Sequence, residues 1–320
     1  MGLDLDLNVS NKKNKINYNK TYDLAIVGIG PAGLTAALYA KRKGLDIIII
    51  GNKEGGQVKD TTWVENYLGF EKIKGEELAN KFKKHIENNE IDIYNDKSVK
   101  AIENDDLKKI ILSNKKEIKS KALIVATGGS PRKLNVKGEE EFYSKGVTYC
   151  AICDGPLFKE KNVAIAGGGN SAVEAAIDLS KIASHVTIIQ RSTLKADKIL
   201  IDKLKDISNV DILLQHQVKE ISGDKRVRKV TALDKKNDKI VEIKIDGLFV
   251  EIGNIPNSKP FNILDMNPKK QIIVNKKNET SIPGIFAAGD VTNVSYKQII
   301  IAASEGAKAA LTATDYLNKK

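Results

Sequence analysis

Runs of four apolar residues alternate with a glycine turn and a helical pattern near the start of the chain. The run Leu24–Val27 leads into a turn at Gly28–Gly33, apolar residues recur at Leu34 and Leu38, and a second run follows at Ile47–Ile50. Apolar runs of this length are typical of buried strands, and a spacing of three to four residues is typical of a helix face. The pattern predicts a strand, a glycine turn, a helix and a second strand.

The same order returns about 140 residues later. A strand is expected at Val163–Ala166, a turn at Gly167–Ala172, a helix through Leu179 and a strand at Val186–Ile189. Strand–helix–strand units with a glycine-rich first turn are the building blocks of dinucleotide-binding domains. The two copies indicate two nucleotide-binding modules.

Two further segments have the pattern of a domain edge. The stretches "KALIVATGGSPRKL" and "DGLFVEIGNIPNSKPF" each lead a buried strand into a turn of Gly and Pro. The second module lies between them in the sequence, and "TSIPGIFAAGDVTNVSYKQIIIAASEGAKAALTATDYL" after them predicts a strand, a turn and a long helix. The simplest arrangement is an α/β fold in which the second module is inserted into the first.

Length and composition fit this arrangement. A chain of 320 residues, 41% of them hydrophobic, suits two packed domains. The apolar runs are far shorter than the roughly 20 residues of a membrane helix, so we expect no membrane association. Residues 1–20 are rich in Asn and Lys and lack an apolar core of signal-peptide length, which predicts a flexible N-terminal arm and a cytoplasmic, reducing location.

The formal net charge is +11, and it comes mostly from scattered lysines. Arginine occurs at only five positions and forms no cluster interleaved with aromatic residues. This distribution argues against nucleic-acid binding. A weak electrostatic preference for an acidic protein partner stays open.

Each glycine turn has the residue types that a pyrophosphate requires. Gly28 permits the tight turn, Gly30 lets the backbone approach the phosphates, and Gly33 allows the helix to pack closely on the strand. The N–H groups and dipole of the following helix then attract the phosphates. Because both turns follow a strand and precede a helix, we interpret them as dinucleotide sites and not as purely structural turns. The corresponding residues of the second turn are Gly167, Gly169 and Ala172.

The positions that usually contact the adenosine ribose are altered in both modules. The first module lacks the acidic residue expected about 20 residues after the glycines, since its strand ends at Gly51 with Asp46 before it and Glu54 after it. In the second module, "QRSTLKAD" offers Arg191 and Lys195 where a carboxylate would bind the 2′-hydroxyl of NAD. Their charge favours the 2′-phosphate of NADP, unless both are ordinary solvated side chains.

The two cysteines of the chain, Cys150 and Cys153, lie together in "TYCAICDGPLF". A CxxC spacing brings two sulfurs within reach of a disulfide and commonly lowers the pKa of one thiol. The three histidines are distant from the cysteines in sequence, which argues against a metal site. Two inert thiols are a weaker interpretation because both cysteines share one turn beside Asp154. A nicotinamide, a flavin and a disulfide would together form three stations for electrons.

These motifs together resemble those of the bacterial-type, low-molecular-weight thioredoxin reductases, which are pyridine nucleotide-disulfide oxidoreductases. The similarity runs from about Tyr22 to the C-terminus and is far more specific than any single motif. The matching stretches, in the family's order, are "GIGPAG", "GGQV", "VENYLGF", "ATG", "CAICDG", "GGGNSAVEAA", "GLFVEIGNIPN" and "TSIPGIFAAGDV".

The resemblance implies two Rossmann-like FAD/NAD(P)-binding domains, the second inserted in the first. Residues 21–132 and 256–320 would bind FAD, and residues 133–255 would bind NADPH and carry the CxxC. Electrons would pass from NADPH through FAD and the disulfide to oxidised thioredoxin. The resemblance also implies a homodimer and a large domain rotation, for which Lys133–Gly138 and Asn254–Asn257 match the two chain crossings.

Roles for individual residues follow from the same resemblance. Cys153 would face the flavin, Cys150 would attack the disulfide of thioredoxin, and Asp154 would donate a proton. The expected FAD contacts are Gly28, Gly30, Pro31, Ala32, Gly33, Gly56, Gln57, Asn66, Gly289, Asp290 and Gln298. The expected NADPH contacts are Gly167, Gly169, Asn170, Ser171, Ala172, Arg191 and Lys195.

The segment "QRSTLK" departs from the family pattern, which has a His-Arg-Arg stretch followed by another Arg. Lys does not replace the forked contacts that Arg makes with a phosphate. NADH or an acidic ferredoxin therefore stays open as the electron donor, although the intact glycine turn at Gly167 argues against a lost nucleotide site. A nucleotide-binding redox sensor is the non-enzymatic alternative.

Overall fold

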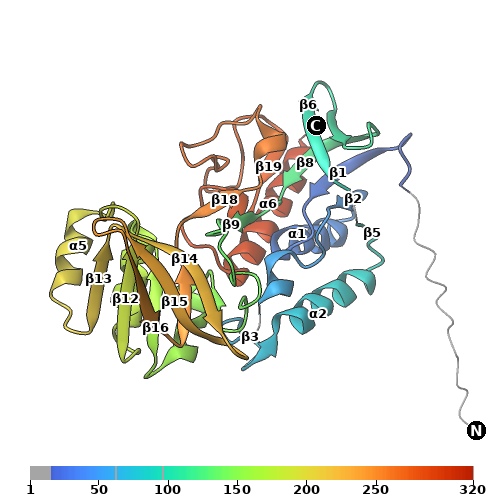
Figure 1. The fold of residues 1–320 in the computed structure, drawn as a ribbon. Coiled ribbons are helices and arrows are strands. Elements are labelled where there is room, and N and C mark those ends of the chain that lie inside the picture. Colours follow the sequence, from blue (N-terminus) through green and yellow to red (C-terminus); the bar gives the residue numbers. More distant parts are fainter. Residues whose placement is uncertain (1–15, 62, 96, 320) are drawn as a thin grey trace, which may run out of the picture. The chain divides into compact units, whose positions relative to one another are not determined.

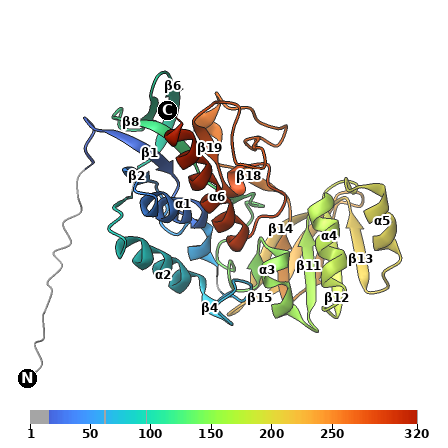
Figure 2. The same ribbon diagram turned by 180° about the vertical axis from the view of Figure 1, so that it is seen from behind.

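The computed structural model describes residues 16–61, 63–95 and 97–319, which form two compact units. The first unit comprises the chain up to Lys59, Glu76–Gly128 and the chain from Pro256 onward, and the second comprises Asp60–Gly75 and Gly129–Ile255. Figures 1 and 2 show their elements from opposite sides. Of the expected N-terminal arm, residues 1–15 lie outside the described residues.

The first unit is built on a seven-stranded sheet. Its strands are β1 (Thr21–Val27), β2 (Ile47–Ile50), β5 (Ile93–Tyr94), β6 (Val99–Asn104), β7 (Lys108–Leu112), β8 (Glu117–Val125) and β19 (Ile285–Ala287). The order is β5-β2-β1-β8-β7-β6, and β19 pairs with β8. β8 is long enough to pair with β7 through residues 117–120 and with β19 through residues 123–125.

Three helices belong to this part of the chain: α1 (Pro31–Arg42), α2 (Gly75–Glu87) and α6 (Ile299–Asn318). Alternate residues of β1 point to opposite faces of the sheet, so Leu24 and Ile26 pack with α1 and α6 while Ala25 joins the core on the other face. Full burial of each Leu or Ile contributes about 1.5–3 kcal/mol. Gly306 lets α6 approach α1, since a Cβ there would lie 2.0 Å from a backbone oxygen of that helix.

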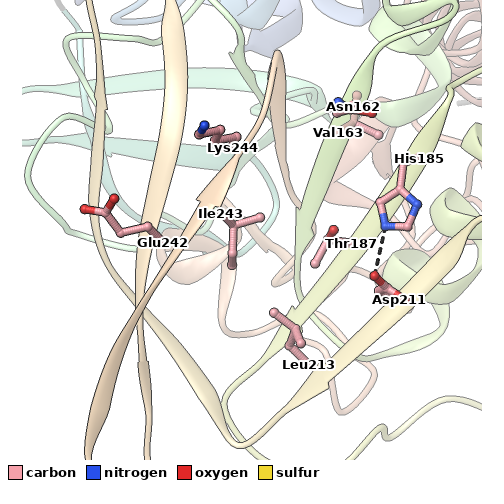
Figure 3. Close-up of a pocket in the computed structure, with 9 residues that line it drawn as sticks. All are labelled: Asn162, Val163, His185, Thr187, Asp211, Leu213, Glu242, Ile243 and Lys244. Atoms are coloured by element: carbon pink, nitrogen blue, oxygen red, sulfur yellow. Dashed lines mark hydrogen bonds and ion pairs between the residues drawn. The ribbon is translucent and has the colours of Figure 1, made fainter.

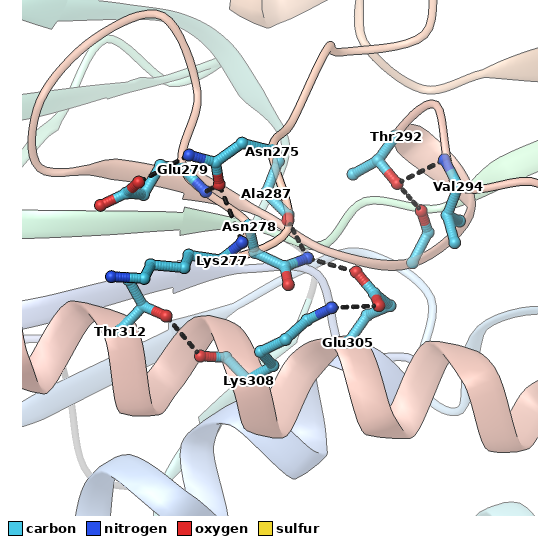
Figure 4. A network of polar contacts seen from close by, with 11 residues as sticks. Asn275, Lys277, Asn278, Glu279, Ala287, Thr292, Val294, Glu305, Lys308 and Thr312 are labelled. Atoms are coloured by element: carbon cyan, nitrogen blue, oxygen red, sulfur yellow. Dashed lines mark hydrogen bonds and ion pairs between the residues drawn. The ribbon is translucent and has the colours of Figure 1, made fainter.

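A polar network fastens α6 to the loop that precedes β19 (Figure 4). The buried side chain of Asn278 donates a hydrogen bond to the Ala287 carbonyl at 2.9 Å and a second one to the Glu305 carboxylate. Lys308 donates to the same carboxylate at 2.8 Å. Since β19 leads directly into Gly289, the network fixes the position of the predicted FAD contacts that follow.

The second unit is built on a five-stranded parallel sheet in the order β10-β17-β11-β12-β13. Its strands are β10 (Val147–Thr148), β11 (Asn162–Ala166), β12 (His185–Gln190), β13 (Val210–Leu214) and β17 (Gly247–Val250). Helices α4 (Asn170–Leu179) and α5 (Lys198–Lys205) pack on one face together with Ile165 and Phe249.

A three-stranded antiparallel sheet covers the other face of the five-stranded sheet. Its strands are β14 (His216–Gly223), β15 (Val227–Asp234) and β16 (Lys239–Lys244). Val218 and Val230 of this sheet pack against Ala164 and Leu248. The parallel sheet is therefore covered on both faces, which explains why its strands read as continuous apolar runs.

Short strands mark the chain crossings. β9 (Gly129–Pro131) pairs with β18 (Asn254–Pro256), so the two crossings lie side by side. The hairpin of β3 (Trp63–Val64) and β4 (Ile73–Lys74) belongs to the second unit, although the predicted domain boundary at residue 132 leaves it in the first. Its segment begins beside residue 144, where Ser144 Oγ donates to the Asp60 carbonyl at 3.4 Å.

The observed elements confirm the predicted α/β fold. Each glycine turn lies between a strand and a helix, at β1 and α1 in the first unit and at β11 and α4 in the second. The second module interrupts the first, as the two domain-edge segments indicate. No helix in the described part of the chain is both long and apolar enough to cross a bilayer.

Candidate functional site

A disulfide joins Cys150 and Cys153, whose Cα atoms are 5.3 Å apart. Helix α3 (Ala151–Asp154) begins directly after Cys150 and lets the chain turn sharply enough to bring the two sulfurs together. The Cys153 N–H donates to Cys150 Sγ at 3.2 Å. Both cysteines are partly buried, while Ile152 between them is 66% exposed. The disulfide thus lies at the surface of its own unit, beside an exposed apolar side chain.

Asp154 is tied to the disulfide turn through Thr148 at the end of β10. The Thr148 hydroxyl donates to the Asp154 carboxylate and accepts the Cys150 N–H at 3.2 Å. Burial raises the pKa of the Asp154 carboxyl, and the hydrogen bond from Thr148 acts in the opposite direction. A carboxyl that retains its proton to higher pH than usual can supply a proton to a nearby thiolate.

The first glycine turn has the geometry expected of a pyrophosphate site. Gly28 has a φ of +121°, and a Cβ there would lie 2.1 Å from the Ala126 carbonyl oxygen. A Cβ at Gly33 would lie 1.9 Å from the Gly28 carbonyl oxygen, so the close helix–strand packing requires glycine. Pro31 is the first residue of α1, where its missing N–H costs nothing.

Several predicted FAD contacts from distant segments meet at this turn. A Cβ at Gly56 would lie 3.2 Å from the Cα of Gly30, and one at Gly289 would lie 3.0 Å from the Cβ of Ala32. Gln57 donates to the Asp290 carboxylate at 3.4 Å. The residues needed for a backbone cradle and the carboxyl that follows β19 are therefore together in the first unit.

Asp290 and Lys297 are the charged pair of this region. Burial raises the pKa of the Asp290 carboxyl, and the charge of Lys297 lowers it. Burial likewise lowers the pKa of Lys297, against the effect of Asp290. A buried carboxylate can accept hydrogen bonds from the hydroxyls of a flavin cofactor, so these residues fit FAD.

The remaining predicted FAD contacts lie in two places. Gln298 precedes the first residue of α6 and has extended backbone angles. Asn66 lies in the Asp60–Gly75 segment, which belongs to the second unit. Its contact with FAD stays a prediction.

Glu54 is the acidic residue that follows β2 in the sequence. It accepts a hydrogen bond from Asn95 at 2.7 Å and pairs with Lys83 at 3.1 Å.

The second glycine turn has a backbone similar to that of the first, but different residues contact it. Gly167 has a φ of +152°, and a Cβ there would lie 2.3 Å from the Glu251 carbonyl oxygen. Ala172 replaces the third glycine and is fully buried against the sheet. A Cβ at Gly168 would lie 2.3 Å from the Gln190 amide nitrogen, so the side chain at the end of β12 covers this turn.

The loop after β12 folds back over the same turn. The Lys195 N–H donates to the Gly168 carbonyl at 2.6 Å. Asn170, the first residue of α4, donates to the Asp197 carboxylate at 2.9 Å and accepts the Asp197 N–H at the same distance. The side chains of Arg191 and Lys195 are exposed, where they can reach a phosphate. The predicted NADPH residues after β12 are thus held near the turn.

Two carboxylates of the second unit were not predicted from the sequence. Glu251 follows β17 and accepts the Ala151 N–H at 3.3 Å, at the start of the disulfide helix. Burial raises the pKa of Glu251 to about 7, with the Ala151 hydrogen bond opposing this effect. Glu251 could have been found from the sequence, because it directly follows the apolar run "GLFV" of a predicted strand. Asp197 has no comparable sequence signal, since its partner Asn170 is 27 residues away.

The cavity in Figure 3 lies away from these residues. It has a volume of about 410 Å³ and is lined by residues of β11, β12, β13 and β16. Within it, His185 of β12 contacts Asp211 of β13 at 3.0 Å. Dinucleotides bind at the carboxyl ends of parallel strands, so this cavity belongs to the opposite edge of the sheet. Among the described residues, no group of three or more His, Cys, Asp or Glu side chains could hold a metal ion.

Comparisons with curated proteins identify close relatives of the chain. It is 44% identical over 310 residues to a subunit of the alkyl hydroperoxide reductase of Escherichia coli, covering 95% of this chain and 60% of the relative. It is 43% identical over 298 residues to an NADH dehydrogenase of Bacillus subtilis, covering 92% of this chain and 58% of the relative. The chain thus spans about three fifths of the length of these relatives.

Solved structures and a family model agree on the fold. The thioredoxin reductase of Streptococcus pyogenes has a TM-score of 0.89 and 38% identity, covering 94% of this chain and all of its own. Residues 22–306 match the model of the pyridine nucleotide-disulphide oxidoreductases. The cofactors implied are FAD and a nicotinamide dinucleotide, as the two glycine turns predict. The chain therefore belongs to the pyridine nucleotide-disulphide oxidoreductase family.

Proposed function

We propose that the protein is a thioredoxin-disulfide reductase that takes electrons from NADPH through FAD and passes them through Cys150 and Cys153 to oxidised thioredoxin. The observation that carries this proposal is the disulfide in the same unit as the second nucleotide turn, with an exposed Ile152 between its cysteines. An apolar side chain beside a surface disulfide suits contact with another protein. The likeness to the Streptococcus pyogenes thioredoxin reductase supports the same function.

Asp154, Cys150 and Cys153 each have a separate role in the proposed reaction. FAD, when bound, would take a hydride from the nicotinamide and supply two electrons to the disulfide. Breaking the Cys150–Cys153 bond with two electrons would leave two thiolates, and the partly buried Asp154 carboxyl would protonate that of Cys153. The Cys150 thiolate then attacks the disulfide of thioredoxin, and Cys153 resolves the mixed disulfide to release the reduced partner.

Flavin absorbance tests the upstream half of the proposal. Purified protein loaded with FAD and mixed anaerobically with NADPH should lose its oxidised-flavin absorbance within one turnover. If neither NADPH nor NADH bleaches the flavin while reduced ferredoxin does, the nicotinamide donor is wrong. A protein that bleaches but never turns over with thioredoxin would be the redox sensor.

A cysteine variant tests the downstream half. Cys150→Ser should still be bleached by the nicotinamide but should lose thioredoxin reduction, because the attacking thiolate is gone. Cys153→Ser is the matched variant, and it should trap a mixed disulfide with thioredoxin. Full thioredoxin turnover by Cys150→Ser would remove the CxxC from the mechanism.

NADH is a second candidate donor, and Gln190 at the end of β12 favours it. Gln190, which is uncharged, covers Gly168, where the family's NADPH pattern has a basic residue. One relative is named an NADH dehydrogenase. The ratio of kcat/KM for the two nucleotides separates the candidates, since a 2′-phosphate that pairs with Arg191 and Lys195 gives NADPH the advantage.

The wider parts of the proposal concern assembly and motion. We propose a homodimer in the cytoplasm and a rotation of the two units about the crossings Lys133–Gly138 and Asn254–Asn257. β18 lies within the second crossing and pairs with β9, which ends just before the first crossing. This pairing supports a hinge formed by both crossings together. Analytical ultracentrifugation tests the dimer. Proline at Lys133 should slow turnover without changing FAD content if this crossing is a hinge.

A further inference from the structure

Glu251 joins three elements of the second unit. It follows β17 at the carboxyl edge of the parallel sheet, and its backbone carbonyl packs against Gly167 of the nucleotide turn. Its carboxylate accepts the Ala151 N–H at 3.3 Å, at the start of the disulfide helix. These contacts connect residues 100 positions apart in sequence. The Glu251 side chain therefore links the disulfide turn to the carboxyl edge of the parallel sheet, where the second glycine turn lies.

The carboxyl of Glu251 is close to the sulfur of Cys150. Only four covalent bonds separate the Ala151 nitrogen from Cys150 Sγ, which places the carboxyl within about 8 Å of that sulfur. At this range a negative charge disfavours a thiolate in a partly buried setting. The charge state of Glu251 consequently affects the ionisation of Cys150.

The groups around Glu251 do not neutralise it. Asp154, the last residue of α3, carries the same sign of charge when ionised. Tyr149, after β10, directs its hydroxyl to Glu139 at 2.9 Å. The glycine turn presents no titratable side chain, and no Lys or Arg in the described ranges forms an ion pair with Glu251. Burial is the main cause of its raised pKa, about 7.

We propose that Glu251 is a positioning residue that controls the thiolate of Cys150 and holds one of the two protons taken up when the disulfide is reduced. Two electrons from a bound, reduced FAD would break the sulfur–sulfur bond. Cys153 would take one proton from Asp154, the Glu251 carboxylate would take the second proton from solvent, and Cys150 would remain a thiolate. The neutral carboxyl permits the Cys150 thiolate to form. The inference rests on the proposed redox cycle of the two cysteines but not on thioredoxin or on either nucleotide.

The test measures Cys150 alone. In FAD-loaded Cys153→Ser protein, the rate of iodoacetamide alkylation at Cys150 is followed from pH 5 to pH 10 and compared with the Cys153→Ser/Glu251→Gln double variant. Gln keeps the acceptor for the Ala151 N–H and removes the charge. We expect the alkylation midpoint to fall by about one pH unit, a roughly tenfold gain in thiolate below the midpoint. Glu242→Gln, on exposed β16, is the matched control and should leave the midpoint unchanged.

Two results would overturn the inference. One is an alkylation profile of the Glu251→Gln protein that superimposes on that of its parent. The other needs no substitution at residue 251: the parent profile should show two steps because Cys150 and a carboxyl titrate together, so a single step contradicts the coupling. Loss of thioredoxin turnover with an intact midpoint shift would remove the proposed function and leave this inference standing.

Discussion

The two glycine turns have nearly the same backbone but differ in the carboxyl beside them. The first turn meets Gly56 and Gly289. Asp290 follows Gly289 directly, and the charge of Lys297 offsets the effect of burial on its carboxyl. The second turn meets Glu251, whose carboxyl has only the Ala151 N–H to offset its burial. Both turns have the backbone that a pyrophosphate requires, and the two carboxyls differ in what offsets their burial.

The largest difference between the turns is at their third position. Gly33→Ala should abolish FAD retention and cost more than about 3 kcal/mol of stability, since overpacking against backbone cannot relax. A Cβ there lies 1.9 Å from the Gly28 carbonyl oxygen. Flavin content and thermal unfolding check the outcome. Normal FAD content in this variant would show that the first turn tolerates alanine as the second does.

The buried carboxyl of the second turn predicts a pH-dependent stability. The pKa of Glu251 is raised by folding from 4.5 to about 7, so the folded state holds the proton more tightly and loses stability as pH rises through this window. Glu251→Gln has no carboxyl to titrate, so it should remove this loss, about 3 kcal/mol between pH 4.5 and pH 8. Thermal unfolding across this range measures the slope, and equal slopes for both proteins would contradict the raised pKa.

The loop after β12 distinguishes the donors at the second turn. Arg191→Ala should lower kcat/KM for NADPH by about tenfold, the size of a charge-assisted hydrogen bond, and leave NADH within about twofold. Arg226→Ala, an exposed arginine elsewhere in the same unit, is the control. An equal loss with both nucleotides would mean that Arg191 does not contact a 2′-phosphate.

The smallest effect is expected at the third position of the second turn. Ala172→Gly should cost about 0.5–1 kcal/mol, because glycine lowers helix stability, and should leave nucleotide affinity unchanged. Chemical denaturation and nucleotide titration measure the two quantities. A stability loss as large as that of Gly33→Ala would show that the third position is equally restricted in both turns.

Local sequence pattern was sufficient for the parts of the site that lie within a few residues of each other. Gly28 and Gly33 belong to one strand–turn–helix unit, and their close contact follows from the turn itself. Cys150 and Cys153 are joined across a single helical turn. The family and the two cofactors followed from the order of such short motifs.

Contacts between distant segments could not be predicted in this way. Gln57 meets Asp290 across 233 residues, and Glu251 meets Ala151 across 100. Asp60–Gly75 belongs with the second unit because its contacts come from that unit, and no change of composition marks the boundary. Such pairings depend on the sheet order, which places segments side by side regardless of their separation in sequence.

By itself, the sequence determined the kinds of chemistry available to this protein: two pyrophosphate turns and a pair of cysteines, each specified by residues that are neighbours in the chain. The tertiary structure alone decided which carboxyls accompany them. Burial and neighbouring charges set the pKa of a carboxyl, and both arise only when β17, α3 and the glycine turn pack together.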